Sequence, residues 1–191
     1  MRPYPLGNDE FVADLVSEVD RVTETVRARF GGLTARQLDW RPAPEAWGVG
    51  HCLAHLARTN ELYRESLTVA LGDAAPEGRL DGAPLRGRWF GRLFTRMVGP
   101  DGMKVKSPRI TRPRPQAAET GALEAFLEEQ RRLRALVEAG RGRDLDRIVV
   151  RSPLASWVRL AASDALRVMV AHELRHLAQA ERVVAHPAFP R

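Results

Sequence analysis

The chain of 191 residues contains one cysteine, only two lysines among its thirty basic residues, and no long apolar run. The single cysteine, Cys52, excludes a disulfide within the chain and favours a reducing compartment. No segment approaches the roughly 18 apolar residues that a membrane span needs, and residues 1–8 lack the apolar core of a signal peptide. We therefore expect a cytoplasmic protein without a membrane partner, and the length predicts one domain, residues 1–191.

The net charge of +6 is concentrated in residues 86–114. This segment has nine Arg or Lys residues against Asp101 alone, so it carries +8 and the rest of the chain −2. Localised positive charge indicates an anionic partner at one place, although a solvated, arginine-rich connection explains it equally well. A nucleic-acid-binding module is only a weak alternative, and we do not expect a nucleic-acid partner, because no recognised binding motif is present and no aromatic ladder extends beyond Trp89 and Phe90.

Apolar residues recur at three- and four-residue intervals, which is the pattern of amphipathic helices. The predicted long helices cover residues 9–30, 49–71, 117–139 and about 163–186, and a short one covers 85–98. Asn8 is the expected N-cap of the first helix. Residues 39–47, 72–84 and 99–115 are rich in proline or glycine and are expected to be irregular. No sheet is expected, although residues 148–150 form a short apolar piece. The predicted fold class is therefore all-α, a four-helix bundle with long connections and a short extra helix.

Four of the five histidines form two pairs, each spaced by one helical turn: His51 with His55, and His172 with His176. With successive helix residues placed about 100° apart, His55, His172 and His176 face the apolar side, whereas His51 lies toward the other side. Three neutral imidazoles with a vacant fourth position are the ligand set of a catalytic zinc site. We therefore predict a metal site of His55, His172 and His176, with His51 either behind these ligands or at the rim of the site. Packing of these histidines without a metal is the alternative.

The same projection places Glu173 inside the bundle, and Arg167 and Arg175 on the opposite side. A buried carboxylate needs a cation, a metal or strong hydrogen bonds, so Glu173 is a candidate for proton transfer or for orienting His176. Gln179 is either a buried amide or a partner that orients an imidazole.

Residues 172–176 also match the H-E-x-x-H pattern of zinc peptidases. A peptidase is a weak alternative because position 182, where the extended motif has its third ligand, is Arg.

Two segments resemble the DinB-like superfamily of metal-binding four-helix bundles: residues 47–61, WGVGHCLAHLARTNE, and residues 171–183, AHELRHLAQAERV. The order of elements is similar from about residue 9 to 186. The resemblance implies a metal held by one histidine on the second helix and a His-x-x-x-His pair on the last, which correspond to His55, His172 and His176. It also implies zinc or nickel, and relatives often pair as homodimers.

Characterised members of that superfamily include S-transferases and isomerases that use bacillithiol, mycothiol or glutathione, and many members have no assigned activity. The resemblance therefore implies transfer of a low-molecular-weight thiol to a small electrophile, with the metal holding the thiol as thiolate at neutral pH. Arg109 and Arg112 of the basic segment would pair with carboxylates of that thiol. A metal-dependent hydrolase would use the same residues, and a metal-binding bundle without catalysis is a further alternative.

Overall fold

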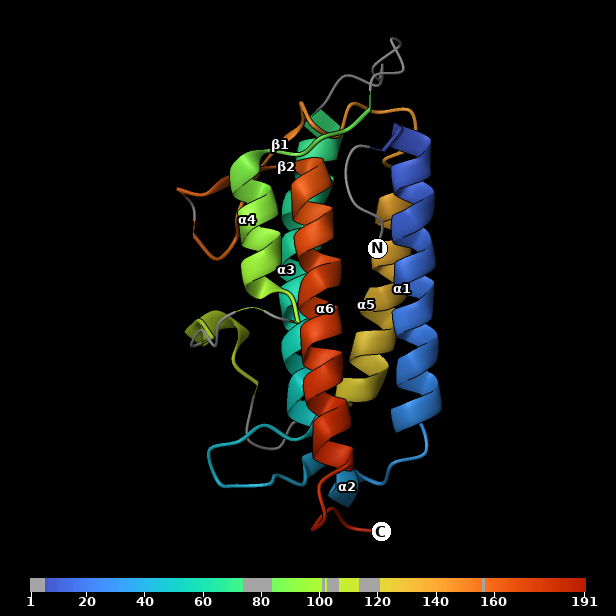
Figure 1. Ribbon diagram of the computed structural model, residues 1–191, viewed down its shortest axis with the longest axis vertical. Helices are drawn as coiled ribbons and strands as arrows, with labels where there is room; N and C mark the ends of the chain where they lie inside the picture. The colour runs from blue at the N-terminus through green and yellow to red at the C-terminus, as the bar shows by residue number, and fades with distance from the viewer. Residues whose placement is uncertain (1–5, 74–83, 101, 103–106, 114–120, 156) are drawn as a thin grey trace.

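The structure is a computed structural model that describes residues 6–73, 84–100, 102, 107–113, 121–155 and 157–191 (Figure 1). Its long helices are α1 (Asn8–Phe30), α3 (Val49–Asp73), α5 (Ala122–Glu138) and α6 (Ala162–Val184). Helices α5 and α6 each contact both α1 and α3, which makes a four-helix bundle and confirms the predicted fold class. The long connection after α3 returns to the end where α3 began, so α3 and α5 run in the same direction (Figure 1). Within the described ranges, none of the helices combines the length and the apolar composition that a membrane crossing requires.

The helix ends agree with the predicted ones to within a few residues, but the start of α1 is capped differently from the prediction. Helix α1 begins at Asn8 itself, Gly7 takes the N-cap position, and no side chain caps the helix. The Asn8 side-chain amide instead donates to the backbone carbonyl of Gly140 at 3.2 Å. Asn8 therefore ties the start of α1 to the end of α5, and its prediction as an N-cap is wrong. Of the predicted third helix, residues 117–120 lie outside the described residues.

Two small elements were not predicted. Helix α2 (Ala35–Asp39) starts with a capping box. The backbone N–H of Gln37 donates to the Thr34 hydroxyl at 3.3 Å, and the backbone N–H of Thr34 donates to the side-chain oxygen of Gln37 at 2.8 Å. Strands β1 (Val149–Arg151) and β2 (Arg159–Ala161) pair antiparallel, with Val150 opposite Leu160. The expectation of no sheet is therefore wrong at this hairpin, where Val150 is buried and both its neighbours in β1 are exposed.

The extra helix, α4 (Trp89–Val98), lies on the outside of α6 (Figure 1). It starts four residues later than predicted because Leu85 forms an antiparallel bridge with Leu6. Gly91 allows the close approach to α6, since a Cβ there would lie 2.1 Å from Cγ of Asp164. The opposite face of α4 leaves Trp89 and Leu93 72% and 54% exposed.

Helix α6 is the most enclosed element, because α1, α3, α4 and the hairpin all contact it. Arg167 is consequently buried, with its guanidinium 5.0 Å from the centre of the Phe11 ring. Arg175 is half-buried and donates to the backbone carbonyls of Met97 and Gly99, at 3.3 and 3.4 Å. The expectation that Arg167 and Arg175 face away from the core is wrong for Arg167, because α4 and α1 cover the side of α6 that an isolated helix would leave to solvent.

The core consists of two apolar clusters, one toward each end of the bundle. Along α1 the first cluster ends at Val19 and the second begins at Val22, and along α6 the change falls between Val170 and Leu177. Polar side chains from all four long helices lie between these clusters: Thr23, Asn60, Gln130 and Glu173. The two clusters are therefore separated by a polar layer, which lies at the level of the His172-to-His176 turn of α6.

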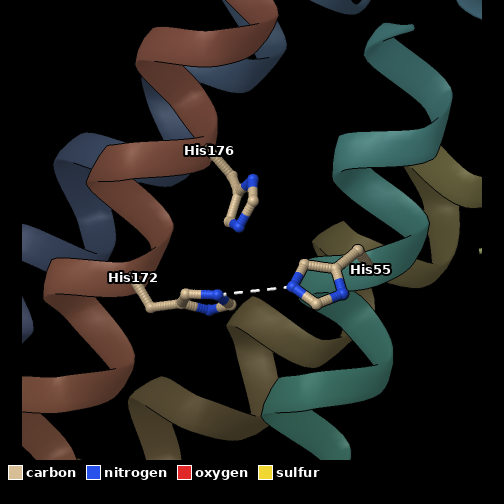
Figure 2. Close-up of side chains that lie close together, drawn as sticks. All are labelled: His55, His172 and His176. Atoms are coloured by element: carbon tan, nitrogen blue, oxygen red, sulfur yellow. Dashed lines mark hydrogen bonds between the residues drawn. The ribbon is translucent and has the colours of Figure 1, made fainter. Parts of the chain in front are cut away.

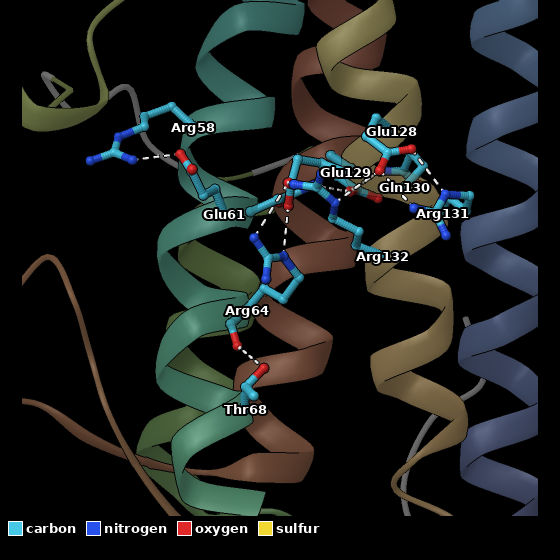
Figure 3. A network of polar contacts seen from close by, with 11 residues as sticks. Arg58, Glu61, Arg64, Thr68, Glu128, Glu129, Gln130, Arg131 and Arg132 are labelled. Carbon is cyan, nitrogen blue, oxygen red and sulfur yellow. Dashed lines mark hydrogen bonds and ion pairs between the residues drawn. The ribbon is translucent and has the colours of Figure 1, made fainter.

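Ion pairs join α3 and α5 on the surface beside this layer (Figure 3). Arg64 of α3 donates to Glu129 of α5 at 2.9 Å, and Arg132 donates to the same carboxylate at 2.8 Å. Glu129 is almost buried, whereas Glu128 pairs with Arg131 in a far more exposed position. The Arg64 pair therefore holds the seam between two helices that carry residues of the polar layer.

Candidate metal centre

Three histidines meet between α3 and α6 (Figure 2). His55 comes from α3, and His172 and His176 lie one turn apart on α6, so that one ring nitrogen from each falls within 4.8 Å of the others. Nε2 of His55 lies 3.3 Å from Nε2 of His172. Two nitrogens bound to one ion at about 2.1 Å lie about 3.0 to 3.4 Å apart in octahedral or tetrahedral coordination. The predicted grouping of the three residues is confirmed, and the distance between His55 and His172 is that of two ligands of one metal ion.

Hydrogen bonds orient two of the three rings. Nδ1 of His55 donates to the backbone carbonyl of Thr111 at 2.6 Å, and Nδ1 of His176 donates to Oε1 of Gln179 at 3.0 Å. A neutral imidazole that is protonated on Nδ1 has its lone pair on Nε2, so these partners assign the donor atoms. Orientation of this kind is typical of metal-binding histidines. The reading of Gln179 as a partner for an imidazole is confirmed, whereas nothing in the sequence pointed to the carbonyl of Thr111.

Burial keeps the three imidazoles uncharged. It lowers the pKa of His55, and it lowers the pKa of His176 to about 3 with a further contribution from the charge of His55. The pKa of His172 falls well below its ordinary value through burial and then through the two neighbouring histidines. Neutral rings with free lone pairs are the form that binds a metal. Without a metal, the 3.3 Å contact can serve as a hydrogen bond from His172 to His55.

Trp47 contacts two of these rings. Its ring centre lies 5.6 Å from that of His176, with the planes 29° apart, and 4.9 Å from that of His55, with the planes 51° apart. From the sequence, only an irregular segment over residues 39–47 was expected here. The position of Trp47 against the histidines depends on how that segment meets the start of α3.

His51 lies outside the group. It is 3% exposed, so the alternative of a rim position is wrong. The unpredicted helix α2 packs against the first turns of α3 through Leu38, which joins Val49 and Leu53 in one apolar cluster. Helix α2 therefore covers the side of α3 that was expected to face solvent around His51.

Glu173 is fully buried, as predicted, but its carboxylate is directed to other partners than the histidines. Oε1 accepts hydrogen bonds from the side-chain amides of Asn60, at 2.5 Å, and of Gln130. Burial raises the pKa of Glu173 to about 7, against the effect of these two donors. Asn60 and Gln130 were missed, although Gln130 stands in the apolar stripe between Phe126 and Leu133 and could have been found there.

The two predicted arginines flank the residue that orients His55. A single turn, η1 (Arg109–Thr111), contacts α3, and Thr111 within it is fully buried. Arg109 and Arg112 are exposed, and Nε of Arg112 donates to the carbonyl of Ser107 at 2.9 Å. The basic side chains of Lys104, Lys106 and Arg114 lie outside the described residues. Part of the basic segment is thus attached directly to the histidine group.

Comparison with known proteins agrees with this fold and this site. A family model described as the DinB superfamily matches residues 18–180. The chain therefore belongs to the DinB superfamily, and the suspected relationship is confirmed. Neither the curated proteins nor the solved structures yield a match.

Proposed function

We propose that this protein is a metal-dependent transferase that joins a low-molecular-weight thiol, of the bacillithiol, mycothiol or glutathione type, to a small electrophile. The observation that carries the proposal is the convergence of three neutral imidazoles, His55, His172 and His176, directly beside a turn that presents two exposed arginines. Zinc and nickel are the expected metals, because imidazole nitrogen suits both.

The histidines would hold the metal, and they fit it in number, spacing and protonation. Three protein ligands are typical of catalytic sites, whereas structural zinc sites have four. When bound, a divalent metal supplies the positive charge that lowers the pKa of a thiol or a water molecule beside it. The hydrogen bonds from His55 to Thr111 and from His176 to Gln179 keep both Nε2 lone pairs directed toward the site.

The thiol has to come from outside the chain. Cys52 is fully buried, and burial raises the pKa of its thiol to about 12, so it is neither accessible nor ionised at neutral pH. Arg109 and Arg112 are exposed on either side of Thr111 and can bind the carboxylates of a cofactor thiol through their planar guanidinium groups.

The transfer is a substitution without redox change. The thiol proton passes to solvent, a sulfur–carbon bond forms, and the bond from that carbon to the leaving group breaks, with its electron pair departing on the leaving group. We assign no part of this step to Glu173, because its Oε1 accepts hydrogen bonds from Asn60 and Gln130 in the core. The same placement speaks against the peptidase alternative, in which this glutamate would have to activate water at the metal.

The test combines metal analysis with an assay on monochlorobimane. We expect purified protein to contain nearly stoichiometric metal, and His172→Ala to contain little. We expect bimane adducts with at least one of the three thiols, loss of that activity on chelation, and recovery with zinc or nickel. If the protein binds metal and hydrolyses esters in a metal-dependent way but transfers no thiol, its function is that of a hydrolase and the transferase proposal is wrong. Bound metal with neither activity would leave a metal-binding bundle, and absence of metal would overturn the proposal.

A further inference from the structure

The indole of Trp47 joins two parts of the candidate metal centre that come from different helices. Its ring contacts both His55 of α3 and His176 of α6, with ring centres 4.9 and 5.6 Å away. These two histidines also lie close to each other, with ring centres 4.8 Å apart and planes 69° apart. A single side chain therefore stacks on one candidate ligand, His176, and makes a tilted contact with a second, His55.

The hydrogen bonds on these two rings do not by themselves define their planes. His55 and His176 are each held at one atom, Nδ1, by the bonds to Thr111 and Gln179. A ring held at one edge atom can still tilt about that atom, and tilting moves Nε2 at the opposite edge. Contact with an aromatic face restricts this motion, since aromatic pairs prefer defined tilted or offset arrangements. Trp47 supplies such a contact to both rings.

The backbone fixes where the indole can be. The next residue, Gly48, packs so tightly that a Cβ would lie 2.2 Å from the carbonyl oxygen of Trp40. The Gly48 carbonyl in turn accepts a hydrogen bond from the N–H of Cys52, at 3.2 Å, in the first turn of α3. The segment before α3 is thus attached both to Trp40 and to α3, which places Trp47 relative to His55, eight residues further on.

We propose that Trp47 is a positioning residue of the metal centre, which holds the imidazoles of His55 and His176 in the orientation that binds the metal and excludes water from one side of them. This inference rests on the proposed function, because it assumes that the three histidines bind a metal. Hydrogen-bonding partners that orient metal-binding imidazoles affect metal affinity by about ten- to a hundredfold, and the apolar surroundings of a site control the access of water to it. The residue acts through His55 and His176, and no contact with a substrate is required.

The test measures metal binding without any enzymatic readout. Affinity is measured for Co²⁺ by competition with a chelator, and coordination is monitored by the visible absorption of the bound ion. We expect Trp47→Ala to bind Co²⁺ at least about tenfold more weakly with an altered spectrum. Trp47→Phe, which keeps an aromatic face, should stay close to the wild type. The matched control is Trp40→Ala, because it keeps the backbone carbonyl that faces Gly48 and removes only a ring that packs against His186 and Phe189, away from the site. This variant should bind Co²⁺ like the wild type.

Tryptophan emission gives a second, independent readout. Bound Co²⁺ should quench emission in the wild type and in Trp40→Ala, and Trp47→Phe should lose most of this quenching while keeping its affinity. If Trp47→Ala does not fold, as judged by circular dichroism, Trp47→Leu takes its place, because it keeps a large apolar side chain and removes the aromatic face, and the same loss of affinity is expected. A folded Trp47→Ala protein with wild-type affinity and spectrum would overturn the inference and leave the proposed function intact. Failure of the wild type to bind any metal would overturn both.

Discussion

Nδ1 of His55 donates a hydrogen bond of 2.6 Å to the backbone carbonyl of Thr111, 56 residues away along the chain. This one bond attaches the arginine-rich connection between α3 and α5 to the group of histidines. Ser107 belongs to the same contact, since its hydroxyl lies 3.1 Å from the Thr111 hydroxyl and 3.4 Å from Nδ1 of His55. Any ligand that binds the exposed arginines here will therefore lie near the candidate metal.

The first prediction follows from this attachment. Arg109→Ala should raise the KM for a carboxylate-bearing thiol several-fold, because it removes a guanidinium partner of the carboxylate, while metal content stays unchanged. Steady-state kinetics at varied thiol, together with elemental analysis, measures both. The control is Arg131→Ala, which removes an exposed arginine on α5 that pairs with Glu128. Equal effects of the two substitutions would contradict a role for Arg109.

The second prediction concerns Cys52. Because this thiol is buried and its pKa is raised to about 12, a disulfide reagent at pH 8 should leave it unmodified in the folded protein and modify it in urea. The sign of its effect on stability follows from the same shift. The folded thiol keeps its proton above pH 9, where the unfolded thiol loses its own, so this group lowers the free energy of unfolding as pH rises from about 9 to 12.

Cys52→Ala should remove that alkaline contribution, so its free energy of unfolding should fall less steeply above pH 9 than that of the wild type. Urea titrations at several pH values compare the two proteins. Rapid modification of the native thiol at pH 8 would contradict the burial described here, and it would restore Cys52 as a candidate nucleophile.

The third prediction separates Glu173 from the metal centre. Glu173→Ala leaves the buried amides of Asn60 and Gln130 without their acceptor and should lower the free energy of unfolding by about 3 kcal/mol. Glu173→Gln keeps an acceptor oxygen and should cost less. The control, Glu128→Ala, removes an exposed carboxylate from the same region and should leave the urea midpoint nearly unchanged.

The metal content and the thiol-transfer activity of the Glu173→Gln variant together distinguish a structural role in the polar layer from a catalytic role. If Glu173 acts only in the polar layer, the variant should retain both metal and thiol-transfer activity. Loss of activity with metal and stability retained would instead support a catalytic carboxylate.

The fourth prediction concerns assembly. The outer face of α4 exposes large apolar side chains, including Trp89, Leu93 and Met97, and such faces are commonly buried between subunits. The expected homodimer should therefore dissociate in Leu93→Glu, as measured by sedimentation velocity. Val69→Glu is the control, because Val69 is equally apolar and 64% exposed but lies on α3. A wild-type protein that sediments as a monomer at all concentrations would contradict the prediction.

Much of the fold could be predicted because the long helices carry a strong apolar periodicity. The three histidines could be grouped because one-turn spacing places His172 and His176 on the same side of one helix, and the apolar face of another helix includes His55. Errors arose where a neighbouring element changed the surroundings of a helix. Arg167 faces away from the apolar stripe of α6, yet α4 and α1 cover it, and α2 packs beside the turns of α3 that contain His51.

The order of side chains along the chain by itself determined which residues share a helix face, and hence the bundle and the three candidate ligands. Only the tertiary structure decided what surrounds them: the Thr111 carbonyl on His55, the Trp47 indole against two imidazoles, and the amides of Asn60 and Gln130 on Glu173. The physical reason is that periodicity follows from the geometry of a single helix. All of these contacts except that of Trp47 with His55 instead join residues distant in sequence, and one of them uses a main-chain carbonyl that every residue type possesses.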